Sequence, residues 1–333
     1  MTAMRGWPLA GLLLATIAVG GAEAVEIPVQ SRQIVTFQGA SPGERVGGLT
    51  WRGGIEMDSP DDAFGGFSGV AFVSPDQHLV LVSDRGRFAS GRLVYDDADR
   101  PLALTGVEIE PIRNSKGEPL PNRFSSDAEA LDVIHRDGEA VGVRVGFENL
   151  TRVADFALTN GRPGGAAREV PIPDWLSQRR TNRSIESVCI APPASPIAGS
   201  TLILTEGVYD DAGDHAGWLL GNRDRGPVSY RGSSGLYPTD CVFLPDGDLL
   251  VLERGTAMLS FIMALIRVPA GEVRPDNTMR GEELLRVVGG DIDNMEGIAV
   301  HETPGGETRI VLVSDDNFST WQRNILLEFA LPR

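Results

Sequence analysis

Acidic residues recur at two matched places along this chain. Each member of the first set, which also includes one serine, opens a short apolar segment: Ser68, Glu129, Glu186, Asp240 and Glu296. Each member of a second set follows the next apolar segment along the chain: Asp84, Glu148, Glu206, Glu253 and Asp315. Carboxylates that converge can bind a hard cation through their oxygens or exchange protons with a substrate.

Arginines and an amide accompany these acids. Arg85 and Arg254 each follow an acid of the second set, Arg183 lies three residues before Glu186, and Asn317 lies two residues after Asp315. Arginine is suited to fixed, bidentate contacts with a carboxylate or a phosphate. Closely spaced carboxylates raise one another's pKa values unless a counter-charge is present. Either the arginines neutralise the acids as structural ion pairs, or a bound cation does so.

The elements that must position these residues repeat. Each acid or serine of the first set starts a five-residue segment with apolar residues at its third and fifth places, and these segments begin 54 to 61 residues apart. A second apolar segment follows each one, for example His78–Ser83 and Arg309–Ser314. Units of roughly 55 residues with several short strands and frequent turns are typical of propeller blades. A β-sandwich, the alternative, does not require equal units.

We therefore predict an all-β chain that forms a single β-propeller. Five blades account for the repeats, and a sixth is the alternative if residues 32–60 build more than one strand. The stretch Gly48–Arg52 is expected to supply a strand to the last blade and so to close the ring. In an antiparallel pair the start of one strand lies beside the end of the next. Both acidic sets should then meet at one rim of the central channel.

The N-terminus predicts export. Arg5 precedes an apolar run from Trp7 to Val19, and the small-x-small sequence at 22–24 is typical of a signal peptidase site. We predict a signal peptide at 1–24 and one propeller domain at 25–333, in the periplasm or secreted. A permanent anchor is the alternative, although the run is shorter than a bilayer requires. Cys189 and Cys241 could pair in an oxidising compartment.

The formal net charge of -16 excludes some partners. So acidic a chain should repel nucleic acid and anionic lipid surfaces and attract cations. After signal cleavage we expect no membrane partner. The sequence leaves the oligomeric state open. Four scattered histidines and no Cys-x-x-Cys pair make zinc a poor match, whereas clustered carboxylates suit Ca²⁺.

Several stretches together resemble the phytase-like propeller family, described as having esterase-like activity. They lie between about residue 65 and the C-terminus and include Ser83-Asp84-Arg85-Gly86, Ser126-Asp127-Ala128-Glu129-Ala130, Asn182-Arg183-Ser184-Ile185-Glu186, Pro238-Thr239-Asp240, Leu252-Glu253-Arg254-Gly255, Asp293-Asn294-Met295-Glu296-Gly297 and Ser314-Asp315-Asp316-Asn317-Phe318. Ala130 stands where a glycine often follows the glutamate. The resemblance implies a propeller that hydrolyses esters or phosphoesters of small molecules.

The sequence thus predicts three groups of site residues. The expected Ca²⁺ ligands are Asp84, Glu129, Glu186, Asp240, Glu296 and Asp315. The expected contacts to the substrate anion are Arg85, Arg183, Arg254 and Asn317. The candidate general bases are Glu148, Glu206 and Glu253. Two alternatives stay open: a non-catalytic propeller that binds a ligand or partner through the same rim, and a lactonase-like Ca²⁺ propeller that acts on uncharged esters.

Overall fold

A computed structural model describes residues 24–258 and 260–332 of the chain. The predicted signal peptide therefore falls outside the described residues except for Ala24, and export stays a prediction. No helix within the described ranges is long and apolar enough to cross a membrane.

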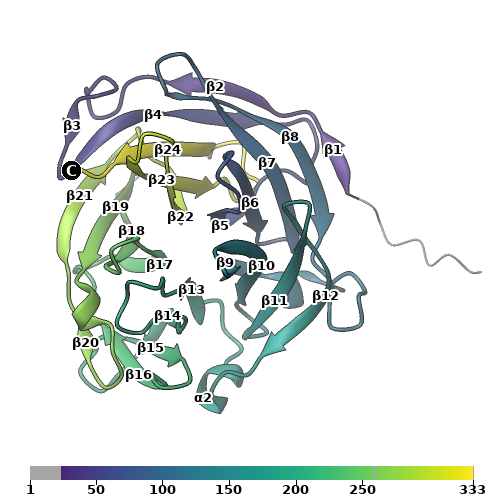
Figure 1. Cartoon of the computed structure of the whole chain (residues 1–333), viewed down its shortest axis with the longest axis vertical. Helices are drawn as coiled ribbons and strands as arrows, with labels where there is room; N and C mark the ends of the chain where they lie inside the picture. Colours follow the sequence, from purple (N-terminus) through teal and green to yellow (C-terminus); the bar gives the residue numbers. More distant parts are fainter. Residues whose placement is uncertain (1–23, 259, 333) are drawn as a thin grey trace, which may run out of the picture.

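Five twisted sheets surround a central axis as the blades of a propeller (Figure 1). Listed from the outer edge inward, the first blade consists of β1 (Val25–Ile27), β8 (Pro101–Pro111), β7 (Arg87–Tyr95), β6 (His78–Ser83) and β5 (Phe67–Phe72). The second consists of β12 (Arg162–Val170), β11 (Arg152–Thr159), β10 (Glu139–Phe147) and β9 (Ala128–Arg136). The third consists of β20 (Thr278–Met279), β16 (Gly226–Tyr230), β15 (His215–Leu220), β14 (Thr201–Tyr209) and β13 (Ile185–Ile190).

The last two blades complete the ring. The fourth consists of β21 (Glu282–Val288), β19 (Ser260–Val268), β18 (Leu249–Ala257) and β17 (Tyr237–Phe243). The fifth consists of β2 (Gln30–Ile34), β4 (Leu49–Asp58), β24 (Asn324–Ala330), β23 (Thr308–Asp315) and β22 (Asn294–Glu302), and β3 (Arg45–Val46) pairs with β4. Short helices occur at α1 (Arg123–Ser126), α2 (Asp174–Ser177) and the 3₁₀ turn η1 (Ala270–Glu272).

The predicted five-bladed propeller is confirmed, and so is its closure by an N-terminal strand. Strand β4 pairs with β24 along its length, with Trp51 opposite Phe329 and Ile55 opposite Leu326. Residues 30–58 join the fifth blade through β2, β3 and β4, so they do not build a sixth. Pairing the two ends of the chain in one sheet removes the exposed edges that an open ring would present.

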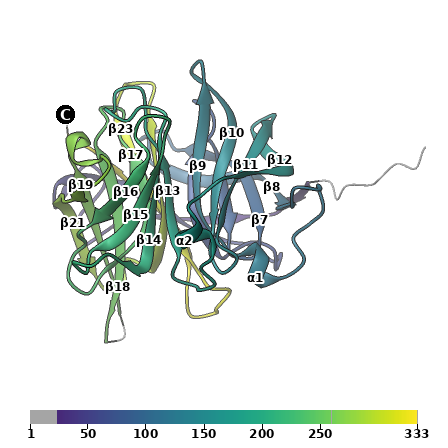
Figure 2. The same cartoon turned by 90° about the horizontal axis from the view of Figure 1, so that it is seen from below.

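The core lies between neighbouring blades. Leu252 and Leu265 of the fourth blade pack in one buried cluster with Leu312 and Leu327 of the fifth, and similar clusters fill the other blade interfaces. The innermost strands β5, β9, β13, β17 and β22 contact one another in that order around the axis. In the side view, α1, which leads into β9, lies near the lower face (Figure 2). The starts of the inner strands therefore lie on that face.

Neighbouring inner strands are tied by different contacts. Asp132 of β9 accepts a hydrogen bond from the backbone N–H of Ile190 in β13, at 2.6 Å. A disulfide joins Cys189 of β13 to Cys241 of β17, with the Cα atoms 5.9 Å apart. Asp240 of β17 accepts a hydrogen bond from the N–H of Ile298 in β22, at 2.9 Å. Each inner strand from β9 to β22 is thus fixed to the next at its side chains.

Reduction of the disulfide should lower the free energy of unfolding by about 4 kcal/mol, from the loop entropy that a 52-residue separation implies. Urea denaturation of oxidised and reduced protein measures the difference. Thiol titration of unfolded, unreduced protein provides the control and should find no free thiol. Equal urea midpoints, or two titratable thiols, would contradict the bridge.

Candidate functional site

A β-bulge interrupts every blade at the same place, near the start of the inner strand. In β9, for example, Ala128 and Ala130 face the adjacent residues Phe147 and Gly146 of β10, so Glu129 is the extra residue. The extra residues of the five blades are Ser68, Glu129, Glu186, Thr239 and Glu296. A bulge bends its strand and turns the extra side chain out of the regular alternation. The backbone therefore marks equivalent positions independently of the sequence.

The second strand supplies a partner position in each blade. In the second blade, for example, Ala128 precedes the bulge and pairs with Phe147 of β10, and the next residue of the chain is Glu148. The equivalent residues of the five blades are Asp84, Glu148, Glu206, Arg254 and Asp315. Together with the five extra residues these make ten positions, which we call the rim positions. Seven of the ten are carboxylates, and Arg254 is the cation among them.

The fourth blade differs from the sequence-based alignment by one residue on both strands. Thr239 and Arg254 hold the rim positions that the pattern gives to Asp240 and Glu253. The segment from Cys241 to Leu244 is apolar throughout, so strand alternation does not fix its frame. The position of the bulge shows that Thr239, not Asp240, is equivalent to the extra residues of the other blades.

Asp240 and Glu253 are consequently buried away from the rim positions. Both are fully buried, at 0 % exposure. Asp240 accepts backbone hydrogen bonds from Cys241, at 2.8 Å, and from Ile298, at 2.9 Å. Glu253 accepts hydrogen bonds from the Tyr230 hydroxyl, at 2.7 Å, and from the Ser233 N–H, at 2.9 Å. These contacts are structural, so neither carboxylate is a candidate metal ligand or general base.

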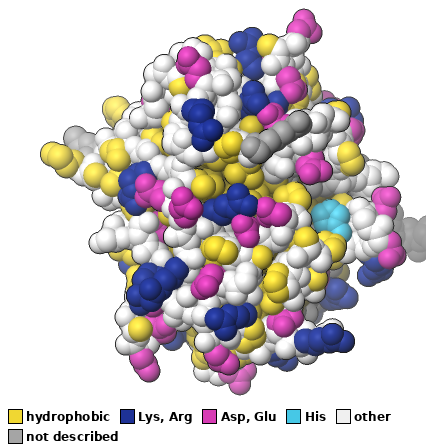
Figure 3. All heavy atoms as spheres, turned by 60° about the vertical axis from the view of Figure 1, so that its left-hand side comes forward, with side chains coloured by type: hydrophobic (Ala, Val, Ile, Leu, Met, Phe, Trp, Pro, Cys, Tyr) yellow, Lys and Arg dark blue, Asp and Glu magenta, His cyan; other side chains and the backbone are white. Residues whose placement is uncertain are grey.

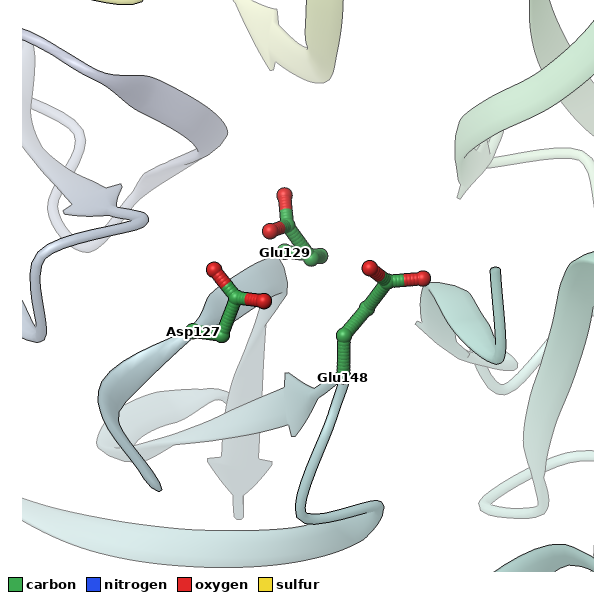
Figure 4. A group of neighbouring side chains, drawn as sticks. All are labelled: Asp127, Glu129 and Glu148. Atoms are coloured by element: carbon green, nitrogen blue, oxygen red, sulfur yellow. The ribbon is translucent and has the colours of Figure 1, made fainter. Parts of the chain in front are cut away.

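Three carboxylates converge in the second blade. Asp127, Glu129 and Glu148 each place one oxygen within 4.8 Å of the others, and Figure 4 shows the three groups directed toward one another. Asn149 donates its amide N–H to Asp127, and the Ser184 N–H donates to Glu148 at 2.8 Å. We call these three residues the carboxylate triad. Asp127 lies in a family motif but is not among the predicted site residues. Its position two residues before Glu129 is the feature that could have identified it.

Burial makes ionisation of these groups costly. It raises the pKa of Glu129 well above its ordinary value, with further contributions from the charges of Asp127 and Glu148. Burial raises the pKa of Glu186 in the same way, with Glu148 adding to the effect. The pKa of Glu148 rises to about 7 and that of Asp315 to about 8, again chiefly through burial. Around neutral pH the rim therefore retains protons unless another positive charge replaces them.

Arg254 supplies part of that charge on the opposite side. Its guanidinium lies 3.1 Å from Glu296, which also accepts a hydrogen bond from the Asn294 amide at 2.8 Å. Burial disfavours the charged form of Arg254, but the carboxylates of Glu296 and Glu186 more than offset this and raise its pKa. The Nε atom of Arg254 is buried without a hydrogen-bond partner among the described residues. It is a donor available to a ligand.

The other predicted substrate contacts lie further out. Arg85 stacks over the Phe318 ring, with the guanidinium carbon 3.1 Å from the ring centroid. Arg183 lies 3.7 Å from Glu206 and is largely exposed. Asn317 donates its backbone N–H to Asp315 at 2.6 Å, so the contact shown is not made by its side-chain amide. The structure brings Arg254 into the rim and places Arg85 and Arg183 beside it.

A cavity of about 510 Å³ opens next to Asp84. Arg85, Arg87 and Arg123 line it, and Arg123 also contacts Asp84 at 3.2 Å. Arg87 and Arg123 carried no repeated pattern and were not predicted. The outer face seen in Figure 3 differs, because basic and acidic side chains intermingle there. Asp61 and Asp62 also line the cavity, so the three arginines leave one positive charge in excess, which suits an anion.

The raised pKa values predict a stability that falls with rising pH in metal-free protein. Asp315 and Glu148 have ordinary values of 3.8 and 4.5, so the native state keeps protons that the unfolded chain has released. That stabilisation is complete below the unfolded values and is lost as pH rises through about 7 and 8. Histidines with lowered pKa values have the opposite effect, but only below about pH 6.5, the ordinary histidine pKa. Between about pH 6.5 and about pH 8.5 the free energy of unfolding should therefore decrease.

Denaturant titrations with chelator present, at a series of pH values, measure this slope. Glu148→Gln removes one titrating group and should make the slope shallower. A metal-free stability that is constant or rises over the same range would contradict the assignment of protonated rim acids.

Comparison with solved structures supports no argument beyond general similarity. A structure of Saccharomyces cerevisiae Sqt1 is 13 % identical over 86 % of this chain and 68 % of that chain, with a TM-score of 0.36. The RRP9 WD40 repeats are 10 % identical over 84 % of this chain and 74 % of that one, with a TM-score of 0.38. A protein of unknown function from Bacteroides caccae is 12 % identical over 72 % and 68 %, with a TM-score of 0.33. No curated protein matches the chain.

A family profile gives the decisive comparison. The profile described as "Phytase-like: Esterase-like activity of phytase" matches residues 62–318. The match includes all five inner strands and all ten rim positions. This chain belongs to the phytase-like family.

Proposed function

We propose that this protein is an exported hydrolase that cleaves ester or phosphoester bonds of a small molecule with the help of bound Ca²⁺. The observation that carries the proposal is the carboxylate triad, whose oxygens converge within 4.8 Å. Burial and repulsion from neighbouring carboxylates raise the pKa of Glu129. A positive ion between the three carboxylates would remove this repulsion and stabilise their ionised forms. Arg123 offsets part of the repulsion at Asp127, but its ion pair is with Asp84.

The donor set fits a hard cation. Asp127, Glu129 and Glu148 would hold Ca²⁺, because carboxylate oxygens are the ligands that this ion prefers. Glu186 is a further rim acid close to the triad, since the charges of Glu148 and Glu129 both add to the burial that raises its pKa. When bound, Ca²⁺ would supply Lewis acidity and lower the pKa of a coordinated water.

The remaining rim residues suit the other tasks of hydrolysis. Arg254, with its unpartnered Nε, would bind the developing negative charge on the reacting group. Arg85 would bind a substrate anion from the adjoining cavity. Glu206, beside Arg183, would accept a proton from the attacking water. Asp84, Glu296 and Asp315, predicted as ligands, occupy other rim positions and would help to balance the positive charge of the ion.

Two observations support export. The N-terminal sequence has the order of a signal peptide, and the Cys189–Cys241 disulfide belongs to an oxidising compartment. The alternatives share this location. A binding module without activity would use the same rim, and a lactonase-like enzyme would act there on uncharged esters.

The test is turnover of aryl phosphates, aryl esters and phytate by purified protein, with Ca²⁺ and with chelator. We expect calcium-dependent hydrolysis of at least one substrate class, lost by at least tenfold in Glu129→Gln, which keeps the shape of the side chain but removes a ligand charge. Asp316→Asn is the matched control. Asp316 lies beside the rim but accepts its hydrogen bonds from Gly66, Phe318 and Asn324. It should keep the calcium dependence.

Arginine variants separate the substrate classes. Arg85→Gln removes a contact to the substrate anion and should lower phosphoester turnover by at least tenfold while sparing uncharged esters. Arg254→Gln removes a contact to the developing charge, which forms in both reactions, and should lower turnover of both classes. Turnover of uncharged esters alone, unchanged in Arg85→Gln, would favour the lactonase-like alternative. Absence of turnover with every substrate, in protein that binds Ca²⁺, would leave the binding module as the function.

A further inference from the structure

A second hollow lies beside the rim, between the third and fourth blades. It has a volume of about 270 Å³ and is lined by Tyr209, Tyr237, residues 213–215 and the loop 232–236. Arg183 connects it to the rim, since its guanidinium lies 5.9 Å from the centroid of the Tyr237 ring and 3.7 Å from Glu206. We call this hollow the tyrosine pocket. None of the roles proposed above uses it.

Aromatic rings form its walls. The His215 imidazole is part of the lining, with its centroid 5.0 Å from that of Tyr209 and 6.2 Å from that of Tyr237. The Tyr237 ring stands nearly perpendicular to the imidazole, at 83°. Walls of this kind offer flat apolar surface together with hydroxyl groups at the ring edges.

The hydrogen-bonding groups of the pocket are either neutral or already paired with an opposite charge. His215 Nδ1 lies 2.7 Å from the carbonyl oxygen of Glu206 and must carry the proton, which leaves Nε2 as an acceptor. Burial lowers the pKa of His215 and favours this neutral form. Asp214, which also lines the pocket, is paired with Arg231 through two contacts of 2.7 Å. Ser233 and Ser234 add hydroxyls, so the pocket contributes no unpaired charge.

The loop that carries these serines is held in place from beneath. Glu253, buried at 0 % exposure, accepts the Ser233 N–H and the Tyr230 hydroxyl. At Gly255 an added Cβ would lie only 2.5 Å from Leu236, so glycine permits the close packing of loop against strand β18. A pocket held this firmly loses little entropy when a ligand binds. Glu253 is a positioning residue for it.

We propose that the tyrosine pocket binds a neutral pyranose ring, the alcohol portion of the substrate. The C–H face of a sugar packs on tyrosine, and its hydroxyls pair with serine, phenol and imidazole groups. A bare aryl group would leave those polar groups unpaired, which costs affinity. The assignment of the pocket as a substrate subsite rests on the proposed hydrolase function, in which the ester of the bound molecule lies near Arg183 and Glu206. The binding of a sugar in the pocket does not depend on that function.

Saturation-transfer NMR on metal-free protein tests the pocket directly, with methyl β-glucopyranoside, methyl β-galactopyranoside and methyl α-mannopyranoside as probes and 4-nitrophenol as the bare aryl comparison. We expect at least one glycoside to bind and Tyr209→Ser to weaken it by at least tenfold. Tyr209 is 47 % exposed, so its replacement should leave the fold intact. Trp321→Ser is the matched control, because Trp321 is an aromatic residue that is 92 % exposed and lies outside the pocket. This variant should bind as wild type does.

Three results would overturn the proposal: no glycoside binds, binding is unchanged in Tyr209→Ser, or only 4-nitrophenol binds at this pocket. Glu129→Gln distinguishes this proposal from the hydrolase. Unchanged glycoside binding in that variant, with calcium-dependent turnover lost, supports both. Glycoside binding by a wild-type protein without any turnover supports the pocket and rejects the hydrolase.

Discussion

The dominant constraint in this molecule is the cost of burying carboxylates side by side. Seven of the ten rim positions are acidic, and burial holds the pKa values of Glu129 and Glu186 well above normal. A single arginine among those positions, Arg254, neutralises the side nearest Glu296. Within residues 24–258 and 260–332 no arginine forms an ion pair with the carboxylate triad, although the charge of Arg123 partly offsets the effect of burial, which raises the pKa of Asp127. If these positions served only stability, apolar or oppositely charged residues would be expected there, because replacing buried charges by well-packed apolar residues is often neutral or stabilising.

The fold tolerates this cost because its stability lies elsewhere. Apolar clusters fill the spaces between blades, the disulfide joins β13 to β17, and β4 closes the ring against β24. The bulges then set each acid at an equivalent place without requiring the rest of the strand to change. Asp132 and Asp240 show the contrasting use of an acid. Each accepts backbone N–H groups and holds two inner strands together.

The sequence predicts the propeller well, since repeats of similar length and strand alternation are both local features. It predicts most of the rim for the same reason: Glu129, Glu148, Glu186 and Glu296 each follow the repeat. It misplaces the fourth blade by one residue, because an unbroken apolar run gives no alternation to read. Asp127, Arg87 and Arg123 were missed as site residues because they lie outside the repeated segments: Arg87 begins β7, Arg123 begins α1, and Asp127 lies between α1 and β9. The tyrosine pocket likewise depends on packing between two blades.

Calcium titration calorimetry at pH 7, in two buffers of different ionisation enthalpy, tests the central claim most directly. If protons now occupy the carboxylate triad and its neighbours, each calcium ion that binds must displace some of them. The account predicts release of about one proton or more per ion, because Glu148 has a pKa of about 7 and that of Glu129 is higher than normal. The release should shrink in Glu129→Gln. Absence of calcium binding, or binding with identical heats in the two buffers, would contradict the claim that calcium replaces protons at the carboxylate triad.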